Sequence, residues 1–143
     1  MTARVSLDDL GAWLLKANGD HSDVAERAAR RDDVARWCVQ RSYRTALMAP
    51  GQPVLLWVSG SRRVTPGVWA VGTLTGRVST GDGRRQHVPV ALRWLEEPVP
   101  RDALRTDPRL GDLEVLRQPM AANPSVATRA EYEAIRAHLS PSP

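Results

Sequence analysis

The chain has 143 residues, 42% of them hydrophobic, so it has the length of one globular domain and too much apolar sequence for wholesale disorder. Twenty basic and 16 acidic residues give a net charge of +4, and neither half of the chain is a polybasic tail. The single cysteine, Cys38, excludes an intrachain disulfide and a multi-cysteine zinc site, and no apolar run approaches the roughly 20 residues of a membrane span. We therefore expect a cytoplasmic monomer that makes no membrane contact and needs no metal or other cofactor.

Several segments of the first half of the chain are predicted to be regular. They are strands at 12–15, 35–39 and 54–58, a helix at 23–33 and one helical turn at 43–48. Val54 to Val58 is the clearest central strand, because every residue in it is apolar. The helix has Ser22 as its expected N-cap and carries a thin apolar stripe, so it is expected on the surface.

The second half of the chain continues with strands and ends in a helix. We expect strands at 67–74 and 87–95, a helical piece at 102–105 and a helix at 128–139. The polar residues 81–85 include two glycines, which is typical of the turn of a β-hairpin. Thr128 and Glu131 fit a capping box at the start of the last helix. Four to five strands joined by short turns are typical of a small barrel or sandwich.

Motifs that would indicate catalysis are missing from the sequence. The three histidines are dispersed, and no nucleophile elbow, Walker loop or dinucleotide fingerprint occurs. The acidic pairs Asp32-Asp33 and Glu96-Glu97 are adjacent in sequence, and such side chains usually point apart or face solvent. We therefore expect a protein that is not an enzyme.

Tryptophan is the unusual residue of this sequence, which has five Trp and no Phe. Three of them have apolar flanks and are expected in the core: Trp13, Trp69 and Trp94. Trp37 differs, because it lies at a loop-to-strand junction beside Arg36, with Arg41 and Arg44 just downstream. An aromatic plane near guanidinium groups is what an extruded or single-stranded base stacks on. Trp37 is therefore a candidate binding residue, with core packing as the alternative.

Short motifs along the chain, taken in order, resemble those of the EVE domain. They are Trp13-Leu-Leu-Lys16, Trp37-Cys-Val39, Tyr43-Arg44, Met48-Ala-Pro-Gly51-Gln-Pro-Val-Leu-Leu-Trp-Val-Ser59, Gly67-Val-Trp-Ala-Val-Gly72, Val99-Pro-Arg-Asp-Ala-Leu104 and Leu116-Arg-Gln118. The resemblance runs over most of the chain. EVE domains belong to the PUA-like superfamily, which also holds the YTH readers of methylated adenine in RNA. The YTH pattern is echoed by Lys16-Ala-Asn18, Trp37-Cys38 and Ser59-Gly60.

The resemblance implies an α+β fold, namely a PUA-like small mixed β-barrel of five to six strands with peripheral helices. Residues 1–143 would form one such domain, with its core at about 11–139 and a frayed tail at 140–143. The resemblance also implies a pocket for an extruded, modified base. By residue-by-residue carry-over, this pocket would be formed by Trp37 as the stacking wall, Cys38 through its backbone, Lys16 and Asn18 at the opening, and Ser59 at the floor.

Two departures from the family pattern leave the modification open. Ala17 stands where the pattern has a serine, and residues 75–87 contain no second aromatic residue for a cage. A methylated adenine and a modified pyrimidine are therefore comparable candidates, and the sequence does not distinguish DNA from RNA.

Arginines in the predicted loops and beside Trp37 are candidate phosphate contacts. They are Arg41, Arg44, Arg62, Arg63, Arg84 and Arg85, and the alternative for each is a role in solubility alone. The leading hypothesis is thus a non-enzymatic nucleic-acid binding module that recognises a modified base. The alternatives are a PUA-like scaffold that binds a small ligand or a protein partner, and, third, an enzyme of nucleic-acid metabolism.

Overall fold

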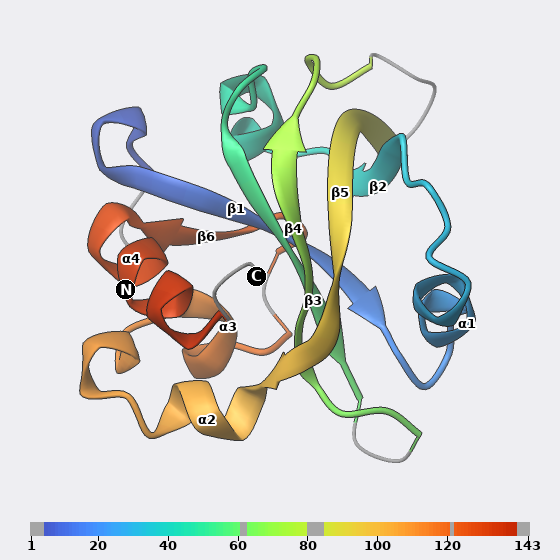
Figure 1. Cartoon of the computed structure of the whole chain (residues 1–143). Coiled ribbons are helices and arrows are strands. Elements are labelled where there is room, and N and C mark those ends of the chain that lie inside the picture. Colours follow the sequence, from blue (N-terminus) through green and yellow to red (C-terminus); the bar gives the residue numbers. More distant parts are fainter. Residues whose placement is uncertain (1–4, 61–62, 80–84, 121, 140–143) are drawn as a thin grey trace.

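A computed structural model describes the chain except residues 1–4, 61–62, 80–84, 121 and 140–143, and its centre is one mixed β-sheet (Figure 1). The sheet has six strands in the order β2-β5-β4-β3-β1-β6 and curves into a half-barrel. The strands are β1 (Leu10–Asn18), β2 (Arg36–Gln40), β3 (Pro53–Ser59), β4 (Gly67–Leu74), β5 (Arg85–Pro100) and β6 (Ser125–Thr128). β1 and β3 are parallel, and the other neighbouring strands are antiparallel.

Helices lie on two sides of this sheet (Figure 1). They are α1 (Val24–Ala29), α2 (Arg101–Arg105), α3 (Glu114–Arg117) and α4 (Arg129–His138), with 3₁₀ turns η1 (Leu7–Asp9), η2 (Tyr43–Leu47) and η3 (Pro108–Leu110). α2, α3 and α4 gather on one side, and α1 lies on the opposite side. The α+β class and the mixed sheet of five to six strands are therefore confirmed.

The central strands separate two hydrophobic clusters, because successive side chains of a strand point to opposite faces. In β3, Val54, Leu56 and Val58 join the cluster inside the half-barrel. Leu55 and Trp57 join the second cluster, together with buried residues of the segment from α2 to α4. Both faces of β3 are thus covered, which explains why this strand is apolar at every position from 54 to 58.

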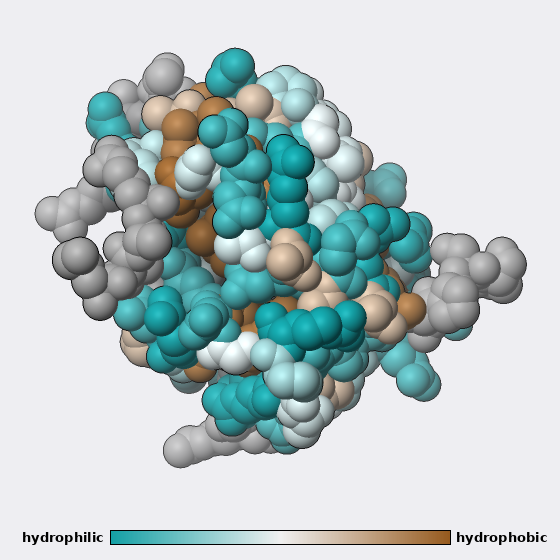
Figure 2. All heavy atoms as spheres, turned by 90° about the vertical axis from the view of Figure 1, so that its left-hand side faces the viewer, coloured by the Kyte–Doolittle hydropathy of each residue, from teal (hydrophilic) through white to brown (hydrophobic). Residues whose placement is uncertain are grey.

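The predicted capping box at the start of α4 is confirmed. The Thr128 side chain accepts a hydrogen bond from the backbone N–H of Glu131, whose carboxylate accepts one from the N–H of Thr128. Ile135 is fully buried, and Tyr132 and Leu139 pack against the same cluster. Arg129, Glu133 and Arg136 of this helix are exposed, and hydrophilic side chains dominate the surface on this side of the molecule (Figure 2).

The strands expected around residues 12–15, 35–39, 54–58, 67–74 and 87–95 are all present, and β1 and β5 are longer than expected. The helix expected at 23–33 is shorter, because Arg31 has a φ of 55° and the chain leaves the helix there. Its N-cap is Asp23, although the Ser22 hydroxyl does accept a hydrogen bond from the N–H of Val24. The turn expected at 81–85 and the tail at 140–143 lie wholly or mostly outside the described residues.

Core positions were predicted correctly for Trp13 and Trp94, whose exposed fractions are 0% and 7%. Trp69 was also expected in the core, but it is only half-buried and its indole N–H donates to the Thr65 carbonyl. β6 and α3 were not predicted, because each has only four residues and so gives no usable periodicity.

Candidate functional site

β1 and β2 approach each other across the open side of the half-barrel, where side chains join them. The indole N–H of Trp37, on β2, donates to the Lys16 carbonyl, on β1, over 3.1 Å. The side-chain oxygen of Asn123 accepts from the backbone N–H of Lys16, and its NH₂ donates to the Cys38 carbonyl. The backbone carbonyl of Asn123 accepts from the N–H of Gln40. One asparagine therefore satisfies backbone groups of both strands.

A cavity of about 850 Å³ opens at this gap. Residues of β1, β2 and the α1 region line it, together with His87 of β5 and Asn123. Its volume lies in the range of roughly 300–1,000 Å³ that is usual for small-molecule and cofactor sites. The cavity can therefore hold a group of the size of a nucleobase.

Trp37 is a half-buried wall of this cavity. Its hydrogen bond to Lys16 fixes the edge of the indole, and part of the ring packs against the cluster inside the half-barrel. The guanidinium carbon of Arg27 lies 5.5 Å from the centre of the Trp37 ring, within the range of a cation–π contact. The orientation of the ring is thus determined by contacts on both its edge and its face.

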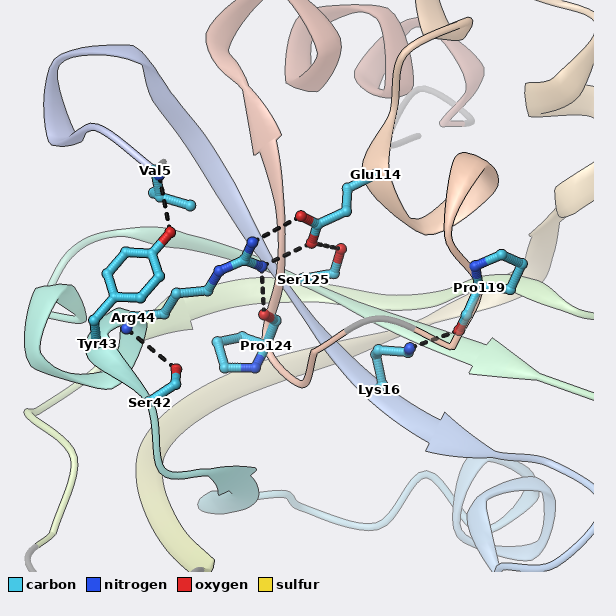
Figure 3. A network of polar contacts seen from close by, with 9 residues as sticks. All are labelled: Val5, Lys16, Ser42, Tyr43, Arg44, Glu114, Pro119, Pro124 and Ser125. Atoms are coloured by element: carbon cyan, nitrogen blue, oxygen red, sulfur yellow. Dashed lines mark hydrogen bonds and ion pairs between the residues drawn. The ribbon is translucent and has the colours of Figure 1, made fainter. Parts of the chain in front are cut away.

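Lys16 ties the segment before Asn123 to β1. Its ammonium group donates to the Pro119 carbonyl over 2.8 Å (Figure 3). Burial lowers the pKa of Lys16 from its ordinary value, and the negative charge of Glu114 partly opposes this effect. Lys16 lines the cavity as expected, and it also positions the chain that carries Asn123.

Arg44 was expected to contact phosphate, and this prediction is wrong. Its guanidinium is buried and forms a bidentate ion pair with Glu114, with both N···O distances at 2.7 Å (Figure 3). It also donates to the Pro124 carbonyl, while the Ser125 hydroxyl donates to Glu114. Arg44 is therefore internal, and its planar fork matches the carboxylate of Glu114.

The ion pair controls how Glu114 titrates. Burial alone would raise the pKa of the Glu114 carboxyl, but hydrogen bonds from Arg44 and Ser125, with the charges of Arg44 and Lys16, outweigh it. The pKa of Glu114 consequently lies below its ordinary value, and the pKa of Arg44 lies above its own because of the bond to Glu114.

The structure brings together three of the five expected pocket residues, Lys16, Trp37 and Cys38. Asn18 and Ser59 do not line the cavity, but pair in register at the ends of β1 and β3. The Asn18 side chain accepts from the N–H of Asp20, and the Ser59 hydroxyl donates to the Ala17 carbonyl. Both therefore act in the local turn structure beside the cavity.

The other expected phosphate contacts have different outcomes. Arg41 and Arg63 are exposed, and the backbone N–H of Arg63 donates to the Asp20 carboxylate. Arg62, Arg84 and the side chain of Arg85 lie outside the described residues.

Sequence reasoning missed most of the side chains that line the cavity, among them Arg27, His87 and Asn123. The pairing of β2 with β5 sets Cys38 opposite His87, but this register was not predicted from the sequence. Asn123 is 107 residues from Lys16 and 85 from Cys38, and no local pattern indicates contacts of that range.

Within residues 5–60, 63–79, 85–120 and 122–139, no group of three or more His, Cys, Asp and Glu side chains is arranged to hold a metal ion. No helix in this part of the chain is long and apolar enough to cross a membrane.

Comparison with known proteins found similarity in structure only. No family model matches the sequence, and no curated protein matches it. Among solved structures, a protein from Pseudomonas putida is 19% identical with a TM-score of 0.67, covering 89% of this chain and 98% of that one. Rpa0253 from Rhodopseudomonas palustris is 15% identical with a TM-score of 0.69, covering 90% and 92%.

Human THYN1, solved in complex with DNA that contains 5-methylcytosine, is 14% identical to this chain. Its TM-score is 0.65, and the match covers 92% of this chain and 99% of THYN1. At such identities the comparisons establish the fold, and they confirm the PUA-like fold that the sequence motifs imply.

Replacing Arg44 by Met should destabilise the protein by about 3–5 kcal/mol, because Glu114 then stays buried without its partner. The double variant Arg44→Met/Glu114→Leu should recover most of this loss, since it removes both charges. Urea denaturation of the parent and both variants measures the two effects. A single variant as stable as the parent would contradict a structural role for Arg44.

Lowering the pH should weaken the contribution of Glu114 to stability. A carboxylate with a lowered pKa stabilises the fold above its ordinary pKa of about 4.3, and the effect is lost as the pH falls further. The difference in unfolding free energy between the parent and Glu114→Gln should therefore shrink from pH 6 to about pH 3. Glu133→Gln, at an exposed pair with Arg136, is the control and should show little difference at any pH.

Replacing Asn123 by Ala should loosen the junction between β1 and β2. The N–H of Lys16 and the carbonyl of Cys38 lose their partners, which should reduce the free energy of unfolding by about 1–3 kcal/mol. Hydrogen exchange at the Lys16 amide should accelerate by more than the change in global stability predicts. Asn18→Ala, beside the cavity, is the control and should leave exchange at Lys16 unchanged relative to global stability.

Proposed function

We propose that this protein is a non-enzymatic nucleic-acid binding module that holds a modified base in the cavity between β1 and β2. The observation that carries the proposal is Trp37, an indole held in a fixed orientation at the wall of a cavity of about 850 Å³. Base–aromatic stacking contributes roughly 1–3 kcal/mol per base, so such a wall is a sufficient anchor. A base must leave its stack to be tested for an added group in a closed pocket.

The charges around the cavity suit a polyanionic partner. Its lining includes the cations Lys16, Arg27 and Arg36 against the single carboxylate of Asp23. Arg41 directly follows Gln40, which also lines the cavity, so Arg41 is well placed to contact a phosphate beside the base.

Arg63 is a second exposed candidate phosphate contact, near the end of β1 through its bond to Asp20. Arg62, Arg84 and Arg85 complete the proposed rim on the strength of the sequence alone. Of these proposed contacts, the two described ones, Arg41 and Arg63, do not line the cavity itself.

The polar side chains in the cavity support binding without chemistry. Lys16 and Asn123 are both engaged in hydrogen bonds that hold the walls of the cavity together. DNA containing 5-methylcytosine is the first ligand to test, because human THYN1 has this fold and was solved with such DNA. The panel should also include methylated adenine and RNA strands, since the cavity geometry does not select among them.

Trp37→Ala should lower the affinity for the preferred modified oligonucleotide about five- to 150-fold, as expected from the loss of one base–aromatic stack. Trp37→Phe keeps an aromatic face and should retain much of the affinity, despite the loss of the bond to the Lys16 carbonyl. Fluorescence anisotropy titrations measure both variants, with thermal melting to confirm that each is folded at the temperature used.

Trp69→Ala is the matched control, because Trp69 is also half-buried and bonded through its indole N–H, but lies away from this cavity. It should leave the affinity unchanged. The affinity of the parent should also fall as salt rises, since phosphate contacts release counterions. Equal binding by Trp37→Ala and the parent, or binding that does not depend on salt, would count against the proposal.

A further inference from the structure

Arg27 lies over the ring of Trp37 at the cavity. It lies on α1, is half-buried, and lines the same cavity as the indole. Its guanidinium carbon is 5.5 Å from the centre of the Trp37 ring. α1 packs at the surface of the fold, whereas Trp37 belongs to the sheet, so the two groups come from separate elements that meet at the cavity.

We propose that Arg27 is the second wall of the base pocket, and that the base is held between its guanidinium plane and the indole of Trp37. This inference rests on the proposed function. A guanidinium is planar and stacks on aromatic faces, so it can take the place of a second aromatic residue. The described residues between 75 and 87 include no Phe, Tyr or Trp for that role, and the imidazole of His87 lines the same cavity.

The spacing requires only a small movement. Stacked bases lie about 3.4 Å apart, so a base between two planes needs about 7 Å from plane to plane. The guanidinium carbon lies 5.5 Å from the ring centre, and its height above the ring plane is no greater, so it has to retreat by at least about 1.5 Å. A long side chain on a short surface helix can make this shift by changing rotamers. In the empty pocket Arg27 therefore covers the face of Trp37, and a base displaces it outward.

A cationic wall selects the charge of the base. An indole alone attracts a positively charged ring through the cation–π effect, whereas a guanidinium on the opposite face repels it. Lys16 and Arg36 add to this positive charge, and Asp23 opposes it. The ligand class is therefore a neutral modified base. Bases whose methyl group fixes a positive charge on the ring, such as 3-methylcytosine and 1-methyladenine, should be rejected.

Pairs of bases with one methyl group each test this, because their members differ in the charge of the ring and in the position of the methyl group, and only the charge should respond to Arg27. The ligands are oligonucleotides of one sequence that carry 5-methylcytosine or 3-methylcytosine, and a second pair with N6-methyladenine or 1-methyladenine. The parent should prefer the neutral member of at least one pair at pH 7. Arg27→Gln should reduce this preference about two- to 30-fold, the range of a single cation–π contact.

Two further variants separate charge from shape. Arg27→Lys keeps the charge without the plane, so it should keep the preference for the neutral isomer but bind that isomer more weakly than the parent does. Arg30→Gln removes the same charge from the end of the same helix, where Arg30 pairs with Asp32 outside the cavity. It should leave the preference unchanged.

The outcomes distinguish this inference from the proposed function. The role of Arg27 is overturned if Arg27→Gln leaves the preference unchanged, or if Arg30→Gln reduces it as much. If Trp37→Ala still weakens binding in that case, the proposed function stands and only the role of Arg27 fails. A parent that binds no modified strand more tightly than the unmodified strand overturns both. Melting curves for every variant show whether it is folded, so that a loss of selectivity can be distinguished from a loss of folding.

Discussion

The candidate site depends on the buried ion pair between Arg44 and Glu114. Neither charge could remain at this position alone, because burying an unpaired charge is strongly unfavourable. Once paired, the two groups have further hydrogen-bonding capacity, which they direct to the Pro124 carbonyl and the Ser125 hydroxyl. Lys16 holds the same segment at Pro119 (Figure 3). The stretch from Pro119 to Ser125 is thus attached near both ends, and this attachment is what places Asn123 between β1 and β2.

Asn123 in turn explains how β1 and β2 can be connected at the open side of the half-barrel while a cavity remains between them. If β1 and β2 were hydrogen-bonded along their length, their backbones would close the gap. The Asn123 amide instead spans the two strands at Lys16 and Cys38, beside the bond from the Trp37 indole to the Lys16 carbonyl. The backbone carbonyl of Asn123 pairs with the N–H of Gln40. At these points the backbone hydrogen-bonding groups of β2 have partners although no strand lies beside them, so this edge of β2 does not present a row of unpaired groups. The space that remains beside the amide is the cavity, with Trp37 as a wall.

The sequence indicates those parts of the fold that local patterns determine. The apolar run of β3, the alternation in β5 and the capping box of α4 each depend on neighbours within a few residues, and each was predicted. Arg44 shows where such reasoning stops. An arginine next to a tyrosine gives the same sequence pattern whether it faces solvent or a carboxylate 70 residues away, and only the folded chain determines which of the two occurs. The roles of Asn123 and Arg27 are equally hard to predict from the sequence, because each depends on a partner on another element.

The arginines of this domain have different roles, and the proposed function assigns affinity and selectivity to different ones. Arg44 is neutralised internally, and Arg31 is used to bond the carbonyls of Trp94 and Leu95. The net charge of +4 therefore does not show which of the cations lie at the candidate site. What matters is which cations remain available at the cavity. Exposed arginines such as Arg41 can attract any phosphate backbone, and so contribute equally to every sequence. In the proposed pocket Arg27 acts on a ring that enters against Trp37, so beyond its share of the positive charge around the cavity it would contribute to choosing the base.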